Sequence, residues 1–455
     1  GVNLYKAAIQ IALGETPTDL NVKTSLVSAE RSLFPRPGKI LSIRGVEEAR
    51  KIKGVKEIIL MKEAGDMAEE PRSNMGKVGY VITVAKTREE AIRINDLARE
   101  TLKIEIGATN DLTWDIIRNN ARRKFYVACK ACTVCDGVEC AGKVPGIGGI
   151  GTGSAFTENL TALARYQVNL RTIHGVKIPE TSVELFGHKL AFPVLAAPIT
   201  GMETNLAEGM DEREYADAIL DGCLECGTLG MVGDGASPKK YLIGLEAIKK
   251  RGGLGIPIFK PREYNLDIIK RFKAAEDAGA IAVGIDIDAA SFKTMSLKGQ
   301  AVGPKTIAEL QELKSHLKVP FILKGIMNVE SALAAIEAGA DAIVVSNHGG
   351  RVMDHMPGTA EVLPEIANAV GGRIKVLVDG GIREGIDILK MLALGADAVM
   401  IGRPVCIAAF GAGQEGVSFY LREKLNELKK AMILTGCGSI GHIDPSVIFR
   451  KKGER

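Results

Sequence analysis

The sequence lacks a long apolar run, a leading signal segment and a strong charge of either sign. No stretch reaches the roughly 18 consecutive apolar residues of a membrane-spanning helix, and no secretory pattern opens the chain. The 455 residues carry a formal net charge of only +4, with Lys and Arg interspersed among Asp and Glu. We therefore expect a cytoplasmic protein without a membrane span, and the charge pattern does not favour a nucleic-acid partner.

Histidine and cysteine are scarce, with six and eight residues respectively. In a reducing compartment cysteines are thiols or metal ligands rather than disulfides. Four of them, Cys129, Cys132, Cys135 and Cys140, fall within the short stretch ACKACTVCDGVECAG. This spacing is close to, but not the same as, that of bacterial ferredoxins. It predicts a metal site, either an iron-sulfur cluster such as 4Fe-4S or zinc; free reduced thiols are the alternative.

From residue 192 onward, short apolar runs alternate with amphipathic helical stretches. The runs cover residues 193–199, 227–232, 255–260, 280–287, 319–324, 341–346, 374–379 and 397–402. Eight strand–helix units over about 250 residues predict an α/β fold of the TIM-barrel type, whose ligands bind at the C-terminal ends of the strands. A doubly wound open sheet is the alternative, but it does not need eight units.

Polar residues stand at the ends of several predicted strands, where such a barrel opens. His348 follows the sixth strand, in SNHGGR, so we expect it to face a ligand instead of packing in the core. Gly380 and Gly381 follow the seventh strand, and Gly402 ends the eighth. Loops at these two positions commonly hold a phosphate on backbone N–H groups, and Arg383 or Arg403 would add a bidentate contact. A phosphorylated ligand is therefore predicted.

These motifs resemble a known family. SNHGGR with the following Asp354, VPFILKGI, VDGGIREG and IGRP are similar to the signature set of the FMN-dependent α-hydroxy-acid oxidising enzymes, which include glycolate oxidase and lactate oxidase. The resemblance covers roughly residues 113–443, and it implies FMN as the phosphate-bearing ligand. The implied reaction is oxidation of a small L-2-hydroxy acid, of the lactate or glycolate kind, to the 2-oxo acid.

The resemblance also assigns roles to individual residues. His348 would take the hydroxyl proton, Asp288 would orient that histidine, Arg351 would hold the substrate carboxylate, and Lys324 would stabilise the reduced flavin. The residues expected to contact FMN are Pro198, Ile199, Thr200, Lys260, Asp286, Lys324, Ser346, Asp379, Gly380, Gly381, Arg383, Gly402 and Arg403.

The chain departs from the family at several of these positions. Asp286 stands where a neutral flavin contact is usual, and Lys260 stands roughly where a glutamine is expected. A second arginine is missing, with Met295 near its place. These changes leave the flavin chemistry in place but put the identity of the substrate in doubt.

The predicted domain order places a separate unit ahead of the barrel. Residues 1–107 read as an α+β domain that resembles the C-terminal lobe of an ATP-grasp ligase, chiefly through GKVGYVITVAKTREEA. No nucleotide lysines or metal carboxylates are recognisable there, so we expect no ligase activity. Residues 108–128 are predicted as a linker, 129–186 as a Cys-rich and Gly-rich leader, and 187–445 as the FMN-binding barrel with a C-terminal helix.

Two alternative functions remain open from the sequence. One is an FMN-dependent isomerase of the type 2 isopentenyl diphosphate kind, although that chemistry gives His348 and Arg351 no role. The other is a non-catalytic flavin or thiol redox sensor. The sequence does not identify the electron acceptor, and the family's habit implies a homo-oligomer.

Overall fold

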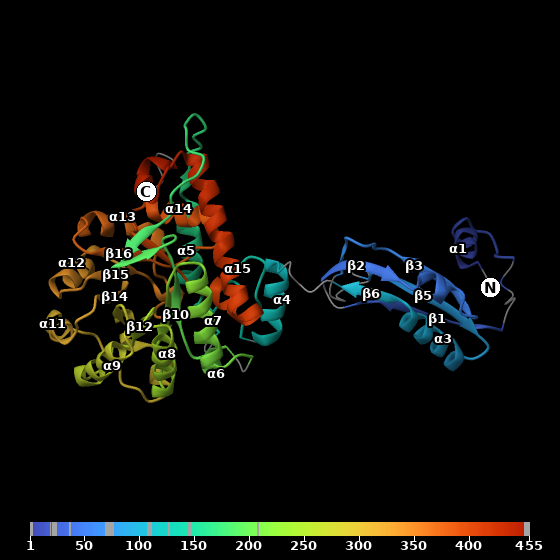
Figure 1. Cartoon of the computed structure of the whole chain (residues 1–455), viewed down its shortest axis with the longest axis horizontal. Coiled ribbons are helices and arrows are strands. Elements are labelled where there is room, and N and C mark those ends of the chain that lie inside the picture. Colours follow the sequence, from blue (N-terminus) through green and yellow to red (C-terminus); the bar gives the residue numbers. More distant parts are fainter. Residues whose placement is uncertain are drawn as a thin grey trace. The chain divides into compact units, whose positions relative to one another are not determined.

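The computed structural model describes residues 3–18, 20, 25–35, 38–68, 77–106, 112–125, 128–143, 147–206 and 209–449. The chain divides into two compact units, Gly1–Leu112 and Thr113–Arg455 (Figure 1). Within the described ranges, no helix has both the length and the apolar character needed to cross a bilayer.

The first unit is an α+β domain with its own core. Its central strand β5 (Gly79–Ala85) pairs antiparallel with β1 (Val27–Leu33) and β3 (Val55–Leu60), and α3 (Arg88–Thr101) packs on β1 and β5. The side chain of Thr87 caps α3 by accepting a hydrogen bond from the Glu90 N–H. The remaining elements are α1 (Leu4–Ala12), β2 (Gly38–Arg44), α2 (Val46–Arg50), β4 (Met67–Ala68) and β6 (Lys103–Ile106).

The second unit contains a closed barrel of eight parallel strands, which confirms the predicted fold class. Every predicted strand is present. The strands are β10 (Val194–Ile199), β11 (Gly230–Gly233), β12 (Ile256–Phe259), β13 (Val283–Asp286), β14 (Phe321–Ile326), β15 (Ala342–Val345), β16 (Lys375–Val378) and β17 (Ala398–Ile401). β17 pairs with β10 and so closes the barrel.

Helices surround the barrel strands in chain order (Figure 1). Local capping fixes the N-termini of some of them; Asp211 and Glu214 form a capping box at the start of α7. The helices are α6 (Met202–Asn205), α7 (Glu212–Glu225), α8 (Pro238–Lys250), α9 (Asn265–Asp277), α10 (Lys293–Ser296), α11 (Ile307–Ser315), α12 (Val329–Glu337), α13 (Thr359–Val370), α14 (Gly385–Ala393) and α15 (Arg403–Thr435). The short 3-10 helices η2 (Ile287–Ser291) and η3 (His348–Gly350) follow β13 and β15.

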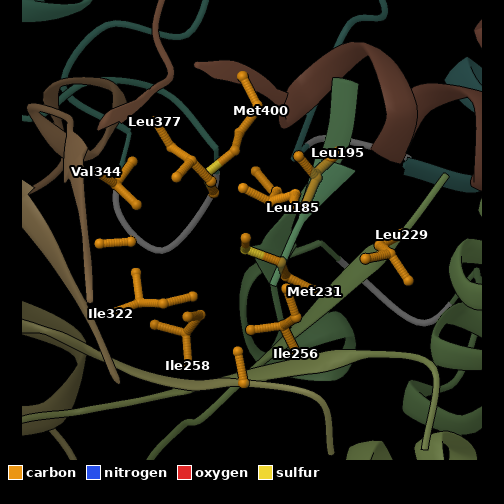
Figure 2. Packing of buried hydrophobic residues seen from close by; sticks show 14 of the residues in the cluster. Leu185, Leu195, Leu229, Met231, Ile256, Ile258, Ile322, Val344, Leu377 and Met400 are labelled. Atoms are coloured by element: carbon orange, nitrogen blue, oxygen red, sulfur yellow. The ribbon is translucent and has the colours of Figure 1, made fainter. Parts of the chain in front are cut away.

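The barrel interior is packed with apolar side chains and is closed at one end by a hairpin. Met231, Ile258, Ile322 and Met400 belong to this core, and Figure 2 shows such side chains converging from the strands. Leu185 and Leu190, from the hairpin of β8 (Val183–Leu185) and β9 (His188–Leu190), belong to the same core. Because that hairpin precedes β10, it lies at the N-terminal end of the barrel and leaves the opposite end for a ligand.

Part of the predicted linker 108–128 is helical and belongs to the barrel unit. α4 (Trp114–Phe125) packs against α15, and Phe125 stacks on Phe410 with ring centroids 4.3 Å apart. A Cβ at Gly411 would lie 2.2 Å from the Ile117 carbonyl oxygen, so the glycine permits this close approach. The prediction missed α4 because its apolar face is short and the basic run near its end reads as solvent-exposed. Positions 108–111, 126 and 127 of that linker lie outside the described residues.

We expect Phe125→Ala to lower the free energy of unfolding of the barrel unit by about 3–5 kcal/mol, the usual cost of truncating a buried aromatic side chain. Denaturant unfolding can be followed by the fluorescence of Trp114, the single tryptophan of the chain, whose ring lies 4.9 Å from that of Tyr420. Lys124→Ala, at the neighbouring exposed position, serves as the control. An unchanged Trp114 transition in Phe125→Ala would mean that α4 is not part of the barrel's cooperative core.

Candidate active site

A cavity of about 300 Å³ lies at the C-terminal ends of the barrel strands. Most of the residues that the sequence assigned to a site line this cavity. They are Pro198, Ile199, Thr200, Lys260, Asp286, Lys324, His348, Arg351, Asp379, Gly380, Gly381, Arg383, Gly402 and Arg403. Among the residues assigned to catalysis or to FMN, the two exceptions are Asp288 and Ser346, which contact His348 and do not line the cavity.

His348 is held at the cavity by two contacts and by an unusual backbone. The Nδ1 atom of its ring lies 3.0 and 3.1 Å from the two carboxylate oxygens of Asp288. Its backbone N–H donates to Ser346 Oγ at 3.1 Å. The His348 φ of 56° is left-handed, which is uncommon for a residue with a side chain and occurs chiefly where function requires it.

The surroundings of His348 favour its neutral form. Burial, together with the positive charge of Lys324, lowers the pKa of His348, although Asp288 and Asp286 act in the opposite direction. A neutral imidazole that donates Nδ1–H to Asp288 leaves Nε2 as a hydrogen-bond acceptor. The geometry therefore supports a base whose accepting nitrogen is the one not held by Asp288.

A buried ion cluster lies beneath the cavity. The Asp286 carboxylate is 2.7 Å from Lys260 Nζ and 3.0 Å from Lys324 Nζ, and all three side chains are almost fully buried. Burial would raise the pKa of Asp286, but the two lysines outweigh it and hold that pKa well below its usual range. The carboxylate in turn raises the pKa of Lys324 despite the burial of that amine. Asp286 is therefore an ionised carboxylate that pairs with both lysines.

Arg351 is the cation best placed to receive an anion. Its guanidinium lines the cavity and lies over the Phe292 ring, 5.2 Å from the centroid. It has no hydrogen-bond or carboxylate partner among the residues that the structure describes. Burial, with Arg403 nearby, lowers the pKa of Arg351 to about 10, so the group stays charged at neutral pH.

Phe292 is a site residue that the sequence did not reveal. Its ring lies 5.0 Å from the His348 ring and 4.7 Å from Lys260 Nζ, and it lines the cavity next to Met295. The only signal was its position shortly after Asp288, in a stretch without strand or helix periodicity.

Arg383 and Arg403 connect the cavity with the segment ahead of the barrel. Arg383 donates to the Cys135 carbonyl at 2.9 Å, while Arg403 donates to the carbonyls of Ile147 and Gly349 at 2.5 and 2.8 Å. Neither guanidinium forms a carboxylate pair within the described ranges. The predicted Gly-rich leader also reaches the cavity, since Ile147 lines it; positions 144–146 of this leader lie outside the described residues.

The four clustered cysteines are free thiols in this structure. Among the described residues, three or more potential ligands come within 4.8 Å of one another only at Asp286, Asp288 and His348. The cysteines do not form such a group, so the metal site predicted from Cys129, Cys132, Cys135 and Cys140 stays a prediction.

Comparisons with known proteins agree with this geometry. A family model described as FMN-dependent dehydrogenase matches residues 147–306 and 293–450. The model of L-amino acid ligase C-terminal domain 2 matches residues 31–107, in agreement with the ligase resemblance of the first unit.

Individual relatives support the same assignment. The chain is 34% identical over 333 residues to 4-hydroxymandelate oxidase of Amycolatopsis orientalis, covering 65% of this chain and 89% of the relative. It is 33% identical over 316 residues to L-lactate oxidase of Lactobacillus jensenii, covering 63% and 75%. A crystal structure of mandelate oxidase with 3,3-difluoro-2-hydroxy-3-phenylpropionic acid superposes with a TM-score of 0.60 and 31% identity, covering 75% of this chain and 99% of that one.

The family match spans more than half of the chain and falls on the barrel that carries the His348 site. The chain therefore belongs to the FMN-dependent dehydrogenase family, and it is an oxidoreductase.

Proposed function

We propose that the barrel unit binds FMN in its cavity and oxidises a small L-2-hydroxy acid, of the lactate or glycolate kind, to the 2-oxo acid. The family match and relatives that are named 2-hydroxyacid, lactate and hydroxymandelate oxidases support the reaction class. One observation carries the proposal: a base held by a carboxylate, His348 with Asp288, borders the same cavity as the unpaired cation of Arg351.

The cavity fits a phosphorylated flavin. Arg383 and Arg403 are oriented by carbonyl groups and have no carboxylate partner within the described ranges, so their charge is available to a phosphate. Gly380 and Gly381, with φ of 100° and 79°, form a turn beside them that exposes backbone instead of side chains. The residues that would hold the ring are Pro198, Ile199, Thr200, Lys260, Asp286 and Lys324, and those that would hold ribityl and phosphate are Asp379, Gly380, Gly381, Arg383, Gly402 and Arg403.

FMN, when bound, supplies a two-electron acceptor. The protein supplies a fixed positive charge, because Lys324 is buried at the cavity and stays protonated. Such a charge favours a ligand that becomes anionic, and it acts strongly because the surroundings exclude water. Ser346 is proposed to act indirectly, since its hydroxyl accepts the His348 N–H beneath the cavity.

His348 is proposed to take the proton of the substrate hydroxyl at Nε2. Asp288 accepts the Nδ1–H, which fixes the tautomer and stabilises the imidazolium that forms once the proton has been transferred. Asp288 does not line the cavity, so it positions the histidine without contacting the substrate.

Arg351 is proposed to bind the substrate carboxylate. Its planar guanidinium can make two parallel hydrogen bonds to a carboxylate, which fixes the orientation of the acid as well as its charge. Phe292 and Met295 are buried beside it and line the same space. These two side chains favour a short aliphatic substituent on the acid.

The two alternatives make different demands on the site. An isomerase of the type 2 isopentenyl diphosphate kind gives no role to a base paired with a carboxylate-binding arginine, and a flavin or thiol sensor requires no turnover. Anaerobic mixing of the FMN-loaded protein with a panel of 2-hydroxy acids separates them. Bleaching of the visible flavin band with at least one acid is the expected result. Failure of every acid to bleach the flavin would contradict the proposed oxidation.

Replacing His348 with Gln is expected to slow flavin reduction by about 10²–10⁴, the usual contribution of a general base. FMN should remain bound, because the proposed phosphate and ring contacts lie on other residues. Rapid mixing with the best substrate measures the reduction rate, and flavin absorbance of the purified variant measures FMN content. If His348→Gln reduces its flavin at the wild-type rate, the base has been assigned to the wrong residue.

Replacing Arg351 with Lys is expected to raise KM and lower kcat together, because an ammonium group cannot reproduce a two-point contact with a carboxylate. Steady-state kinetics on the same substrate measure both constants. A defect confined to FMN affinity, with normal kinetics after FMN is restored, would argue against a substrate contact.

The pH dependence of flavin reduction tests the charge balance around His348. The base must be neutral, and its pKa is lowered by burial and by Lys324. The second-order rate constant for flavin reduction by the substrate should therefore be constant near neutral pH. It should fall only as the pH drops through a value below about 6.5. Lys260 also lowers the pKa of His348, so Lys260→Met should shift this acid limb to higher pH. Lys293→Met serves as the control, because Lys293 is exposed and lies outside the cavity lining. If the acid limb of the pH profile does not move in Lys260→Met, Lys260 is not coupled to the base.

A further inference from the structure

The four-cysteine loop is an ordered part of the barrel unit. Residues 128–143 contain no strand and no α-helix, so their shape depends on side-chain contacts. Arg122 donates to the carbonyls of Lys130 and Ala131 at 2.7 and 3.1 Å. A Cβ at Gly137 would lie 2.3 Å from the Phe156 ring, so the loop also packs closely on α5 (Ser154–Ala164).

The loop is fixed to the mouth of the barrel on its other side. Arg383 donates to the Cys135 carbonyl, and its Nη2 lies 3.6 Å from Cys135 Sγ. The Gly142 N–H donates to the Gly149 carbonyl at 2.7 Å, and a Cβ at Gly148 would lie 1.9 Å from the Cys140 carbonyl oxygen. Cys135 and Cys140 are therefore held next to the cavity by contacts that leave no room for larger residues.

One backbone feature within the loop is directed at a sulfur atom. Ala131 is fully buried and adopts a left-handed φ of 42°, which is rare for alanine. In this conformation its N–H points at Cys129 Sγ, 3.4 Å away. Backbone N–H groups directed at cysteine sulfurs stabilise thiolate ligands and tune iron-sulfur sites. The uncommon conformation of Ala131 thus places a hydrogen-bond donor on the Cys129 sulfur.

The spacing of the sulfurs separates two kinds of metal site. A single zinc ion binds each thiolate at about 2.3 Å, so a tetrahedral set of sulfurs must lie within about 4 Å of one another. No three of these four sulfurs meet even a 4.8 Å limit. A cluster of four irons binds each thiolate through a different iron, which holds the sulfurs farther apart than one ion does. The four sulfurs are therefore not arranged for one zinc ion, whereas a cluster accepts thiolates that lie farther apart.

From the spacing of the sulfurs, the directed Ala131 N–H and the anchoring of the loop, we propose that Cys129, Cys132, Cys135 and Cys140 bind a 4Fe-4S cluster at the mouth of the barrel. Each of the four thiolates takes one iron. This site is separate from the His348 base and the Arg351 cation, so the proposal stands independently of the proposed hydroxy-acid oxidation.

The test is metal analysis of the full-length chain, produced with iron and purified without oxygen. We expect about four irons and four sulfides per chain, a broad visible absorption in addition to that of flavin, and an electron paramagnetic resonance signal after reduction with dithionite. Cys132→Ser, at a partly exposed position, should lose most of the iron while keeping its FMN and its unfolding midpoint.

Cys226→Ser is the matched control, because Cys226 is buried outside the loop and its thiol donates to the Ser418 carbonyl, a contact that serine retains. It should keep the full iron content. About one zinc per chain would overturn the cluster assignment. Absence of metal, with all four thiols open to alkylation in the folded protein, would overturn it as well, as would an iron content that is unchanged in Cys132→Ser.

Discussion

The buried carboxylate of Asp286 is the contact on which the rest of the active site depends. It lies between Lys260 and Lys324 and 4.0 Å from His348 Nδ1. Without it, two ammonium groups would face each other away from water, and an uncompensated buried charge costs several kcal/mol. Asp286 therefore pairs with both lysines, raises the pKa of Lys324 and joins the ends of β12, β13 and β14. Asp286 and Lys260, the two residues that depart from the family pattern, thus form one ion pair with each other.

The same cluster influences the charge of His348. Burial lowers the pKa of His348, the two lysines lower it further, and Asp288 and Asp286 act in the opposite direction, so the neutral imidazole is favoured. Asp288 then decides which ring nitrogen is free. In its left-handed conformation His348 donates its backbone N–H to the Ser346 hydroxyl and places its ring against the Asp288 carboxylate. Electrostatics and backbone geometry thus fix one chemical state of one side chain.

The barrel could be predicted from the sequence because eight apolar runs alternate with amphipathic helices, and most site residues could be located because they end those strands. Contacts between distant segments could not. Examples are the ion pair of Lys260 with Asp286, the hydrogen bond from Arg383 to Cys135 and the contact of the Phe292 ring with Lys260. The local sequence around these residues does not indicate that they touch. α4 was missed for the same reason, since its partner α15 lies some 290 residues later and is recognisable only in the folded chain.

The hairpin of β8 and β9 closes the N-terminal end of the barrel and so restricts how ligands reach the cavity. Leu185 and Leu190 fill the N-terminal end with apolar side chains, whereas the residues that line the cavity lie at the opposite, C-terminal ends of the strands. Substrate, product and any diffusible oxidant must then pass through one shared opening. Departure of one ligand becomes a condition for the next to arrive, and the order of these events is set by the architecture of the barrel as much as by its chemistry.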